Sequence, residues 1–382
     1  MPSDPPQNEA LNLFTGEPQH QNFHRMSDFF PTSPLTASPA PHVFPTGPAL
    51  TLPATYEFDG TTGTSADFLV DTDTAALLVL HDGALCHEQY WLTGGADVQW
   101  ISWSVAKSFV SALIGIAIDE GLIAGVDDMV SSYVPELAGS AYDGVSIKHI
   151  LQMSSGASWN EDYSDPDSDI ARFGAVMAGQ GSLLEFVSGM TRERAPGTFC
   201  QYNSADTQVL GHLLINATGR TITDYMKEKL FDPLGMESPG YWTVDAVGVE
   251  MAFAGLNLTA RDYAKLGELY RRGGEWNGQQ VVPASWVAES TASDEPHMQV
   301  GQILVGSEVF PFGYAYQWWI PSGAPAFTAI GIYNQFVFVD PASGATVVKL
   351  SANHRYGLSP YEADDREGET VAFFRAVIAS LN

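Results

Sequence analysis

The sequence predicts an α/β protein in which an antiparallel sheet flanked by helices is interrupted by an inserted, mainly helical domain. The order of the elements supports this class, because a hairpin comes first, helices follow, and strands with a final helix come last. The chain has 382 residues and 45% apolar content. This size suffices for a large core and suggests two domains, or one domain with a large insertion.

The N-terminal part differs in composition from the rest. Residues 1–55 are rich in Pro, Ser, Thr and His without a clear period, which predicts an extended arm over the surface, or a partly disordered one. We expect residues 56–121 and 250–382 to form the α/β domain. Residues 122–249 are expected to form the mainly helical domain.

The first elements after the arm are a hairpin and a buried helix. Two apolar runs flank Asp82-Gly83 in AALLVLHDGALCHEQYW, which predicts a β-hairpin. The apolar segment FVSALIGIAI predicts a buried helix over roughly residues 104–120 that ends near Gly121. From about residue 122 to residue 245 the pattern is mainly helical with long loops.

The C-terminal part is predicted to be rich in strands. The segments YAYQWWIP, APAFTAIGIYNQFVFVD and ATVVKLSAN predict three successive antiparallel strands. Before them, Thr259 suits the N-cap of a helix that stops at Gly273-Gly274. A last helix over TVAFFRAVIASL closes the chain.

The charge of the chain bears on its partners. A formal net charge of −28, from 45 acidic and 17 basic residues, repels phosphate backbones and anionic lipid. We therefore expect neither nucleic acid nor membrane as a partner. Adaptation to high salt and an ordinary acidic enzyme explain the charge equally well.

Location and cofactors follow from absent signals. The two cysteines, Cys86 and Cys200, form no CxxC pair, and the sequence shows no signal peptide and no run of about 18 apolar residues. These observations predict a cytoplasmic protein. The histidines show no HExxH pattern or ligand-like spacing, so we expect no metal site and no cofactor.

Ser104-Val105-Ala106-Lys107 is the most informative motif. A Ser and a Lys three residues apart on a helix lie on one face, with Cβ atoms about 5–6 Å apart. An amine in an apolar wall loses part of its preference for the charged form and can take a proton from the hydroxyl. The pair suits a serine nucleophile, although a surface Lys with a capping Ser would give the same spacing.

Two further groups complete this chemistry. Tyr202, in the loop Tyr202-Asn203-Ser204, is the best candidate for delivering a proton to the leaving atom, with a buried structural Tyr as the alternative. The oxyanion needs two N–H donors. We expect them to be Ser104 at the helix N-terminus and Ile332, which follows Gly331 on an edge strand. A Gly that marks a β-bulge is the alternative for Gly331.

The ordered motifs resemble those of the serine β-lactamase-like superfamily, and more specifically the 6-aminohexanoate-dimer hydrolases and related carboxylesterases. The resemblance covers about residues 90–350 and is carried by these segments: WSVAKS, VPELAGSAYDG, NEDYSDP, QYNSA, TARDYAKLG, QWW and AIGIYNQ. It implies a β-lactamase or penicillin-binding-protein-like fold and an acyl-enzyme mechanism. Ser104 then matches the nucleophile, Lys107 the base and Tyr202 the proton donor.

The same resemblance implies residues that contact substrate. Ser204 matches the third residue of the Tyr-x-Asn/Ser motif, and Tyr163 in NEDYSDP matches a loop Tyr that closes over substrate. Trp319 matches an aromatic wall of the site. Tyr333-Asn334 stands where the 6-aminohexanoate-dimer hydrolases are expected to carry His-Gly, so Tyr333 is a further candidate contact. A solvated loop Tyr and a core aromatic are the alternatives for Tyr163 and Trp319.

One departure narrows the expected substrates. β-Lactamases and penicillin-binding proteins carry Lys or His, then Thr or Ser, then Gly on the late strand, whereas this chain has Ala329-Ile330-Gly331. The cation that pairs the carboxylate of a β-lactam is absent, which argues against β-lactamase and cell-wall peptidase activity. A neutral ester or amide fits better.

The sequence thus predicts a serine hydrolase that cleaves small amides or esters through an acyl-enzyme. A carboxylesterase without amide activity and a catalytically idle penicillin-recognising module are the alternatives. The small-molecule substrate is the expected partner, and a homodimer is left open.

Overall fold

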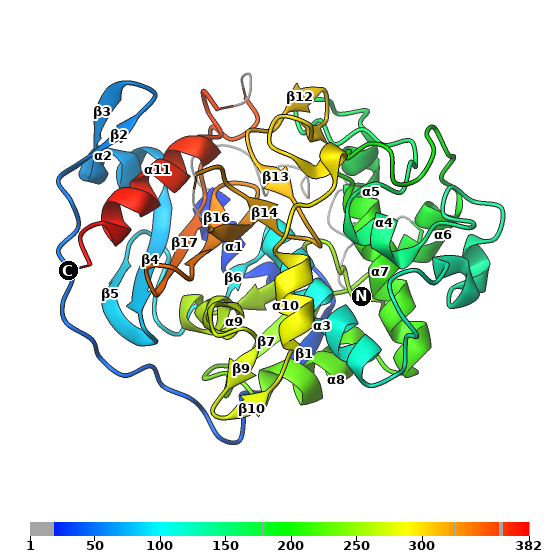
Figure 1. The fold of residues 1–382 in the computed structure, drawn as a ribbon, viewed down its shortest axis with the longest axis horizontal. Coiled ribbons are helices and arrows are strands. Elements are labelled where there is room, and N and C mark those ends of the chain that lie inside the picture. Colours follow the sequence, from blue (N-terminus) through cyan, green and yellow to red (C-terminus); the bar gives the residue numbers. More distant parts are fainter. Residues whose placement is uncertain (1–18, 178, 180, 324, 359–361, 382) are drawn as a thin grey trace, which may run out of the picture.

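A computed structural model of the chain describes residues 19–177, 179, 181–323, 325–358 and 362–381. Its centre is an antiparallel sheet with the strand order β13-β14-β15-β16-β17-β4-β5 (Figure 1). The strands are β13 Gly313–Tyr314, β14 Trp319–Ile320, β15 Phe327–Gly331, β16 Gln335–Asp340, β17 Ala345–Ser351, β4 Thr74–His81 and β5 Ala84–Tyr90. The predicted antiparallel sheet is confirmed, and strands from the two ends of the sequence meet where β4 pairs with β17.

Helices cover both faces of this sheet because side chains alternate along each strand. Phe336 and Phe338 of β16 face α11 (Glu367–Ile378), whose Phe374 ring lies 5.5 Å from each of theirs. The intervening valines of β16 face α9 (Ala260–Arg271), where Gly267 lets the helix approach closely. The two cores therefore lie on opposite sides of one sheet.

The first predicted hairpin is confirmed, whereas the first two of the three late strands are wrong, because each contains a turn between two strands. YAYQWWIP, residues 314–321, runs from the end of β13 through a turn into β14. β4 and β5 are joined at Asp82-Gly83, and both residues have positive φ, as a tight hairpin turn requires. The second late segment, residues 324–340, was expected to form one strand. Residue 324 lies outside the described residues. The remaining residues contain a hairpin in which residues 332–334 join β15 to β16. Tyr333 and Asn334 adopt φ of 63° and 67° there, and the sequence pattern lacks the glycine that usually marks such a turn.

A second, smaller sheet has the order β1-β7-β8-β6. Its strands are β1 Thr32–Leu35, β7 Gly240–Thr243, β8 Leu256–Leu258 and β6 Trp100–Ile101. The predicted N-terminal arm thus supplies a strand, while residues 1–18 of it lie outside the described residues. Three two-stranded pairs complete the strands: β2 Thr55–Phe58 with β3 Thr61–Thr64, β9 Glu275–Trp276 with β10 Gln279–Gln280, and β11 Leu304–Val305 with β12 Glu308–Val309.

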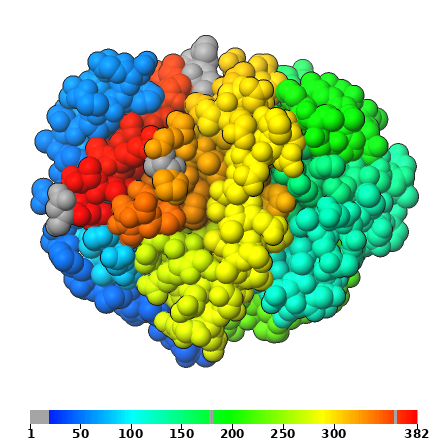
Figure 2. All heavy atoms as spheres, viewed as in Figure 1, coloured from blue at the N-terminus to red at the C-terminus, as the bar shows by residue number. Residues whose placement is uncertain are grey.

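The remaining α-helices are α1 His20–Phe23, α2 Ser65–Asp71, α3 Ala106–Asp119, α4 Ile147–Leu151, α5 Asp169–Met177, α6 Leu183–Ser188, α7 Ser204–Thr218, α8 Ile222–Met226 and α10 Ala284–Ser290. Helices α4 to α7 gather on the right side of the molecule, and α8 lies at the bottom of the view, in contact with β1 (Figure 1). In the space-filling view the yellow chain from α10 to the β11–β12 hairpin runs between this green part and the orange and red C-terminal part (Figure 2). The predicted domain boundaries themselves stay predictions. None of the helices in the described ranges is long and apolar enough for a membrane span.

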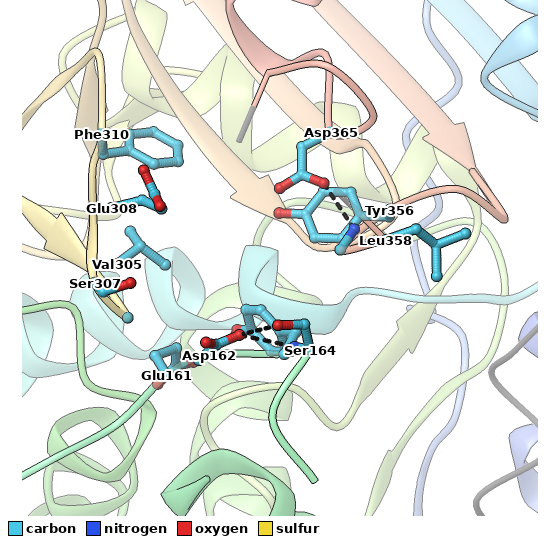
Figure 3. A pocket seen from close by; sticks show the side chains of 13 residues that line it. Glu161, Asp162, Ser164, Val305, Ser307, Glu308, Phe310, Tyr356, Leu358 and Asp365 are labelled. Carbon is cyan, nitrogen blue, oxygen red and sulfur yellow. Dashed lines mark hydrogen bonds between the residues drawn. The ribbon is translucent and has the colours of Figure 1, made fainter. Parts of the chain in front are cut away.

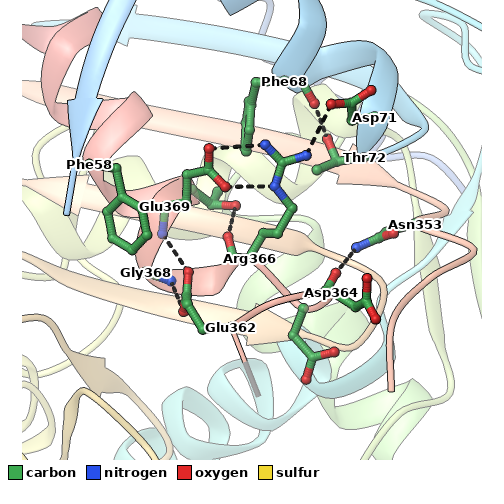
Figure 4. A network of polar contacts seen from close by, with 12 residues as sticks. Phe58, Phe68, Asp71, Thr72, Asn353, Glu362, Asp364, Arg366, Gly368 and Glu369 are labelled. Carbon is green, nitrogen blue, oxygen red and sulfur yellow. Dashed lines mark hydrogen bonds and ion pairs between the residues drawn. The ribbon is translucent and has the colours of Figure 1, made fainter. Parts of the chain in front are cut away.

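A polar network fixes the start of α11 (Figure 4). Arg366, with φ of 56°, pairs with Glu369 at 2.6 Å and with Asp71 of α2 at 3.5 Å. Glu362 accepts hydrogen bonds from the backbone N–H groups of Gly368 and Glu369, which a helix N-terminus leaves free. This network fixes the position of the chain on either side of Arg366. That chain contributes residues to the cavities described below.

Candidate active site

Ser104 lies in the turn of 3₁₀ helix Trp103–Val105 that leads directly into α3. Its side chain is 8% exposed, and Lys107 is 1% exposed in the first turn of α3. The Lys107 Nζ atom lies 2.8 Å from Ser104 Oγ, so the predicted pairing of hydroxyl and amine on one helix face is confirmed as geometry. The apolar segment that follows is buried along nearly its whole length, as expected.

The Lys107 amine is enclosed by three oxygen atoms and two rings. Besides Ser104, it donates to Ser204 Oγ at 3.1 Å and to the carbonyl oxygen of Phe253 at 2.9 Å. Nζ also lies 5.1 Å from the centre of the Tyr202 ring and 5.7 Å from that of the Phe253 ring. Burial lowers the pKa of Lys107 to about 7, and the negative charge of Glu161 opposes this shift. An amine with this pKa is substantially neutral near pH 7 and can accept the serine proton.

Glu161 is a buried carboxylate that the sequence did not single out. It accepts hydrogen bonds from Ser204 Oγ at 2.6 Å, from Ser204 N at 3.0 Å and from Tyr163 OH at 2.7 Å. The indole N–H of Trp159 also donates to it. Ser204 thereby links the carboxylate to Lys107, which gives a chain of polar groups from Glu161 through Ser204 and Lys107 to Ser104.

Tyr202 reaches the same point from a loop. Its backbone N–H donates to Leu304 O at 2.8 Å, and its ring stacks on Trp319 with 5.1 Å between centres. Burial, assisted by Glu161, raises the pKa of the Tyr202 phenol well above its usual value, while a hydrogen bond with Ser104 opposes the shift. The phenol therefore remains protonated and is able to donate to a leaving atom beside Ser104.

Gly331 lies against the backbone of the nucleophile. A Cβ atom at this position would sit 3.1 Å from Ser104 N and 2.5 Å from Ser102 O, so a side chain would push β15 away from the turn that carries Ser104. The expectation that Gly331 lies on an edge strand is wrong, because β14 pairs with β15; that pairing involves Thr328, and residues 329–331 extend beyond it. Ile332 lines the same small cavity as Ser104.

The other predicted contacts fall in different places. Tyr163 and Trp319 line the cavity at Ser104, whereas Ser204 lies behind it between Lys107 and Glu161. The Tyr333 ring packs 5.5 Å from those of Trp103 and Tyr356, and it is not among the residues that line either cavity described below. Contact of these residues with substrate stays a prediction.

Two cavities meet at this point. The inner one, of about 20 Å³, is lined by Ser104, Tyr163, Tyr202, Val305, Phe310, Trp319, Ile330, Ile332, Tyr356 and Glu367. The outer one, of about 360 Å³, adjoins it and lies between the Tyr163 loop, the β11–β12 hairpin and the chain around Tyr356 (Figure 3). The outer wall carries carboxylates, among them Glu308 and Asp365, and neither cavity is lined by a Lys, Arg or His of the described chain.

Sequence reasoning missed much of this lining for a physical reason. Glu161 and Glu367 are two of 45 acidic residues, and nothing in their neighbours separates a buried carboxylate from a solvated one. Val305 lies in a strand of two residues and Tyr356 in a turn, and both segments are too short to show a period in the sequence. The described residues contain no cluster of three or more His, Cys, Asp or Glu side chains that could hold a metal ion.

A Ser-x-x-Lys pair in a helix that starts beside an antiparallel sheet, with a Tyr from a neighbouring loop at the same point, is the arrangement of serine hydrolases with a β-lactamase-like fold. The comparisons with known proteins agree. The chain belongs to the Beta-lactamase family, whose model matches residues 66–372. The resemblance noted from the motifs is thus confirmed.

Individual relatives show which members of this family the chain resembles. The chain is 32% identical over 293 residues to the 6-aminohexanoate-dimer hydrolase of Paenarthrobacter ureafaciens, which covers 74% of each protein. A β-lactamase of Yersinia enterocolitica is 28% identical over 42% of this chain and 40% of its own length.

Solved structures agree on the fold. A Bacillus anthracis protein provisionally assigned as a 6-aminohexanoate-dimer hydrolase has a TM-score of 0.83 at 23% identity, and the match covers 96% of this chain and 95% of that one. A family VIII carboxylesterase has a TM-score of 0.61 at 17% identity, over 83% and 95% of the two chains. The protein is therefore a serine hydrolase by family, with the predicted fold class.

Proposed function

We propose that the protein hydrolyses small neutral esters and amides, with Ser104 as nucleophile, Lys107 as base and Tyr202 as proton donor. The observation that carries this proposal is the 2.8 Å contact between Ser104 Oγ and the buried Lys107 amine, whose pKa is lowered to about 7. Membership of the Beta-lactamase family supports it.

In the acylation step, Ser104 Oγ attacks the substrate carbonyl carbon and its proton passes to Lys107 Nζ. The negative charge on the carbonyl oxygen is stabilised by the backbone N–H groups of Ser104 and Ile332. Tyr202 then protonates the leaving oxygen or nitrogen and recovers a proton from Lys107. Water attacks the acyl-enzyme, gives its proton to the same relay and releases the acid.

The Tyr202 donor matters more for amides than for esters. An alkoxide leaves with little help, whereas an amide nitrogen must be protonated as the C–N bond breaks. The raised pKa of Tyr202 keeps its proton available at neutral pH. Likeness to a 6-aminohexanoate-dimer hydrolase supports amide cleavage, and likeness in fold to a carboxylesterase is compatible with ester cleavage. Tyr163 and Trp319, which line the inner cavity, are the proposed substrate contacts.

Anionic substrates fit this site poorly. The lining of the outer cavity includes Asp162, Glu308 and Asp365 and no basic side chain among the described residues, so a substrate carboxylate would lie unpaired beside like charges. A β-lactam such as nitrocefin carries such a carboxylate and no cation, whereas the 6-aminohexanoate dimer is a zwitterion whose ammonium group the acidic wall can pair. We therefore propose that β-lactams are turned over much more slowly than short esters.

The test is a substrate panel: p-nitrophenyl butyrate, 6-aminohexanoate dimer and nitrocefin, with kcat/KM measured for each. We expect hydrolysis of the ester and of the amide, and a nitrocefin value lower than the ester value by at least about a hundredfold, the scale of an unpaired charge in a closed site. Ester hydrolysis without amide hydrolysis would assign the protein as a carboxylesterase. Comparable rates on nitrocefin and ester would contradict the argument from charge.

We further propose that the protein acts in the cytoplasm on a small molecule and does not bind nucleic acid, with a homodimer left open. The net charge of −28 supports the absence of nucleic-acid binding, because it repels phosphates. Cys86 and Cys200 are both buried and unpaired, which suits a reducing compartment.

A further inference from the structure

The two cavities share part of their walls. Four side chains line both the inner cavity at Ser104 and the outer cavity: Tyr163, Val305, Phe310 and Tyr356. These side chains therefore form the boundary between the two spaces. The inner cavity, at about 20 Å³, has room for roughly one water molecule. A substrate whose carbonyl carbon reaches Ser104 must keep most of its remaining atoms in the outer cavity.

Three walls of this boundary are aromatic and held in place. The hydroxyl of Tyr163 donates to Glu161 and that of Tyr356 donates to Glu367, each at 2.7 Å. The two rings face each other edge-on, with 6.4 Å between their centres. Phe310 is 3% exposed and stacks on the Trp319 ring at 4.0 Å. Displacing any of these rings would break a hydrogen bond or a stacking contact.

Val305 is the fourth residue of the boundary and the only aliphatic one of the four. Its backbone is held by hydrogen bonds of the neighbouring residues, and its side chain borders both cavities. It lies at the end of β11, where Leu304 donates its N–H to Cys200 O and accepts from Tyr202 N. Phe310 N donates to Ile303 O at 2.9 Å and closes the base of the hairpin. Figure 3 shows Val305 and Phe310 on one side of the outer cavity and Tyr356 on the other. The size of the side chain at position 305 then sets the width of the opening.

We propose that Val305, with the three rings, forms a neck that selects substrates by shape: unbranched acyl chains pass to Ser104, and chains branched beside the carbonyl are excluded. This inference rests on the proposed function and specifies its substrate class. An opening bounded by these fixed rings and Val305 accepts a methylene chain, whereas an extra methyl group on the first carbon must displace a ring or Val305. Val305 is thus a specificity-determining residue on a hairpin that carries none of the proposed catalytic groups.

The test compares two isomeric esters, p-nitrophenyl butyrate and p-nitrophenyl 2-methylpropanoate, so that chain branching changes while composition does not. Val305→Ala should lower the ratio of kcat/KM for the linear ester to that for the branched ester by about tenfold, the lower end of what one methyl-sized group decides in a pocket. Val309→Ala is the matched control: Val309 is on the same hairpin, is 54% exposed and lines neither cavity. The ratio of linear to branched kcat/KM in Val309→Ala should equal the ratio in the unmodified protein.

The outcomes separate this inference from the function on which it rests. A Val305→Ala ratio within about twofold of the unmodified protein, well below the expected pocket effect, would overturn the neck while leaving the hydrolase intact. An equal change in the Val309→Ala control would also overturn it, because the effect would then come from the hairpin as a whole. Failure of the unmodified protein to hydrolyse either ester would overturn the proposed function itself. Thermal unfolding midpoints of both variants check that the fold is retained.

Discussion

Lys107 carries the chemistry because its surroundings set its protonation state. The free amine has to accept a proton from Ser104, and the ammonium ion cannot. Burial lowers the pKa of Lys107 to about 7, whereas the charge of Glu161 raises it. Burial and the charge of Glu161 therefore shift the pKa of Lys107 in opposite directions. Each of these two effects leads to a separate prediction.

The first prediction concerns pH. Because the neutral amine is the base, kcat/KM for p-nitrophenyl butyrate should rise with pH through about pH 7 and fall away below it. The measurement is kcat/KM from pH 5 to pH 9, corrected for spontaneous hydrolysis of the ester. A rate that stays flat through this range would mean that no group with the lowered pKa of Lys107 controls acylation.

The second prediction concerns Glu161. Glu161→Gln removes the negative charge that raises the pKa of Lys107, so the acid limb of the pH profile should move to lower pH by about one unit. Glu308→Gln is the control, because Glu308 is an exposed carboxylate on the wall of the outer cavity. A shift in the opposite direction in Glu161→Gln, or an equal shift in both variants, would reject the electrostatic role of Glu161.

Site residues that belong to a sequence motif could be predicted, and site residues outside any motif could not. Ser104, Lys107 and Tyr202 were found because a hydroxyl, an amine and a phenol in ordered motifs match a known chemistry. Glu161 was not, since a carboxylate in a polar loop resembles many solvated ones until the loop folds over Ser204.

Among the elements, the turn between β15 and β16 is the one that places Ile332 beside Ser104. Asn334 is fully buried there, with φ of 67°. Its side-chain N–H donates to Asp365 O at 2.6 Å, and its oxygen accepts from Asn353 at 2.8 Å. The turn is therefore tied to the chain that lines the outer cavity.

The third prediction separates backbone strain from side-chain contacts at this turn. Asn334→Ala loses both hydrogen bonds and keeps a Cβ atom in the left-handed region, whereas Asn334→Gly loses the same hydrogen bonds but relieves the strain of that Cβ atom. Both variants should be less stable than the unmodified protein, and the Ala variant by about 1 kcal/mol more than the Gly variant. Urea unfolding measures both free energies. A Gly variant less stable than the Ala variant would contradict the strain.

The sequence predicted the elements with a clear period and missed this hairpin. The apolar stretch over residues 324–340 has the alternation of a strand on both sides of the turn, and Tyr-Asn is a weaker turn signal than Asn-Gly. The Asp82-Gly83 hairpin, which has the strong signal, was predicted correctly.

At the scale of the whole molecule, the net charge of −28 opposes the compact state through self-repulsion. The fourth prediction is that the thermal unfolding midpoint rises as NaCl is increased from about 0.01 M to about 1 M, since the screening length falls from roughly 30 Å to 3 Å. A midpoint that stays constant or falls would show that self-repulsion contributes little to the free energy of unfolding.

The fold class could be predicted because it depends on the order and period of long segments, which the whole sequence records. The two cavities could not, because they arise where the Tyr163 loop, the β11–β12 hairpin and the chain before α11 meet, and these segments are far apart in the sequence. Ion pairs such as Arg366 with Asp71 join parts that no local pattern connects.

The central claim is that Ser104 is the nucleophile, and covalent labelling tests it most directly. A fluorophosphonate probe should attach to the unmodified protein at Ser104, as located by peptide mass spectrometry, and should fail to label Ser104→Ala. Ser111→Ala, in the helix α3 that directly follows Ser104, is the matched control and should still be labelled. Hydrolysis of p-nitrophenyl butyrate by Ser104→Ala should fall by about three orders of magnitude or more. Labelling at another residue, or full activity in Ser104→Ala, would contradict the account.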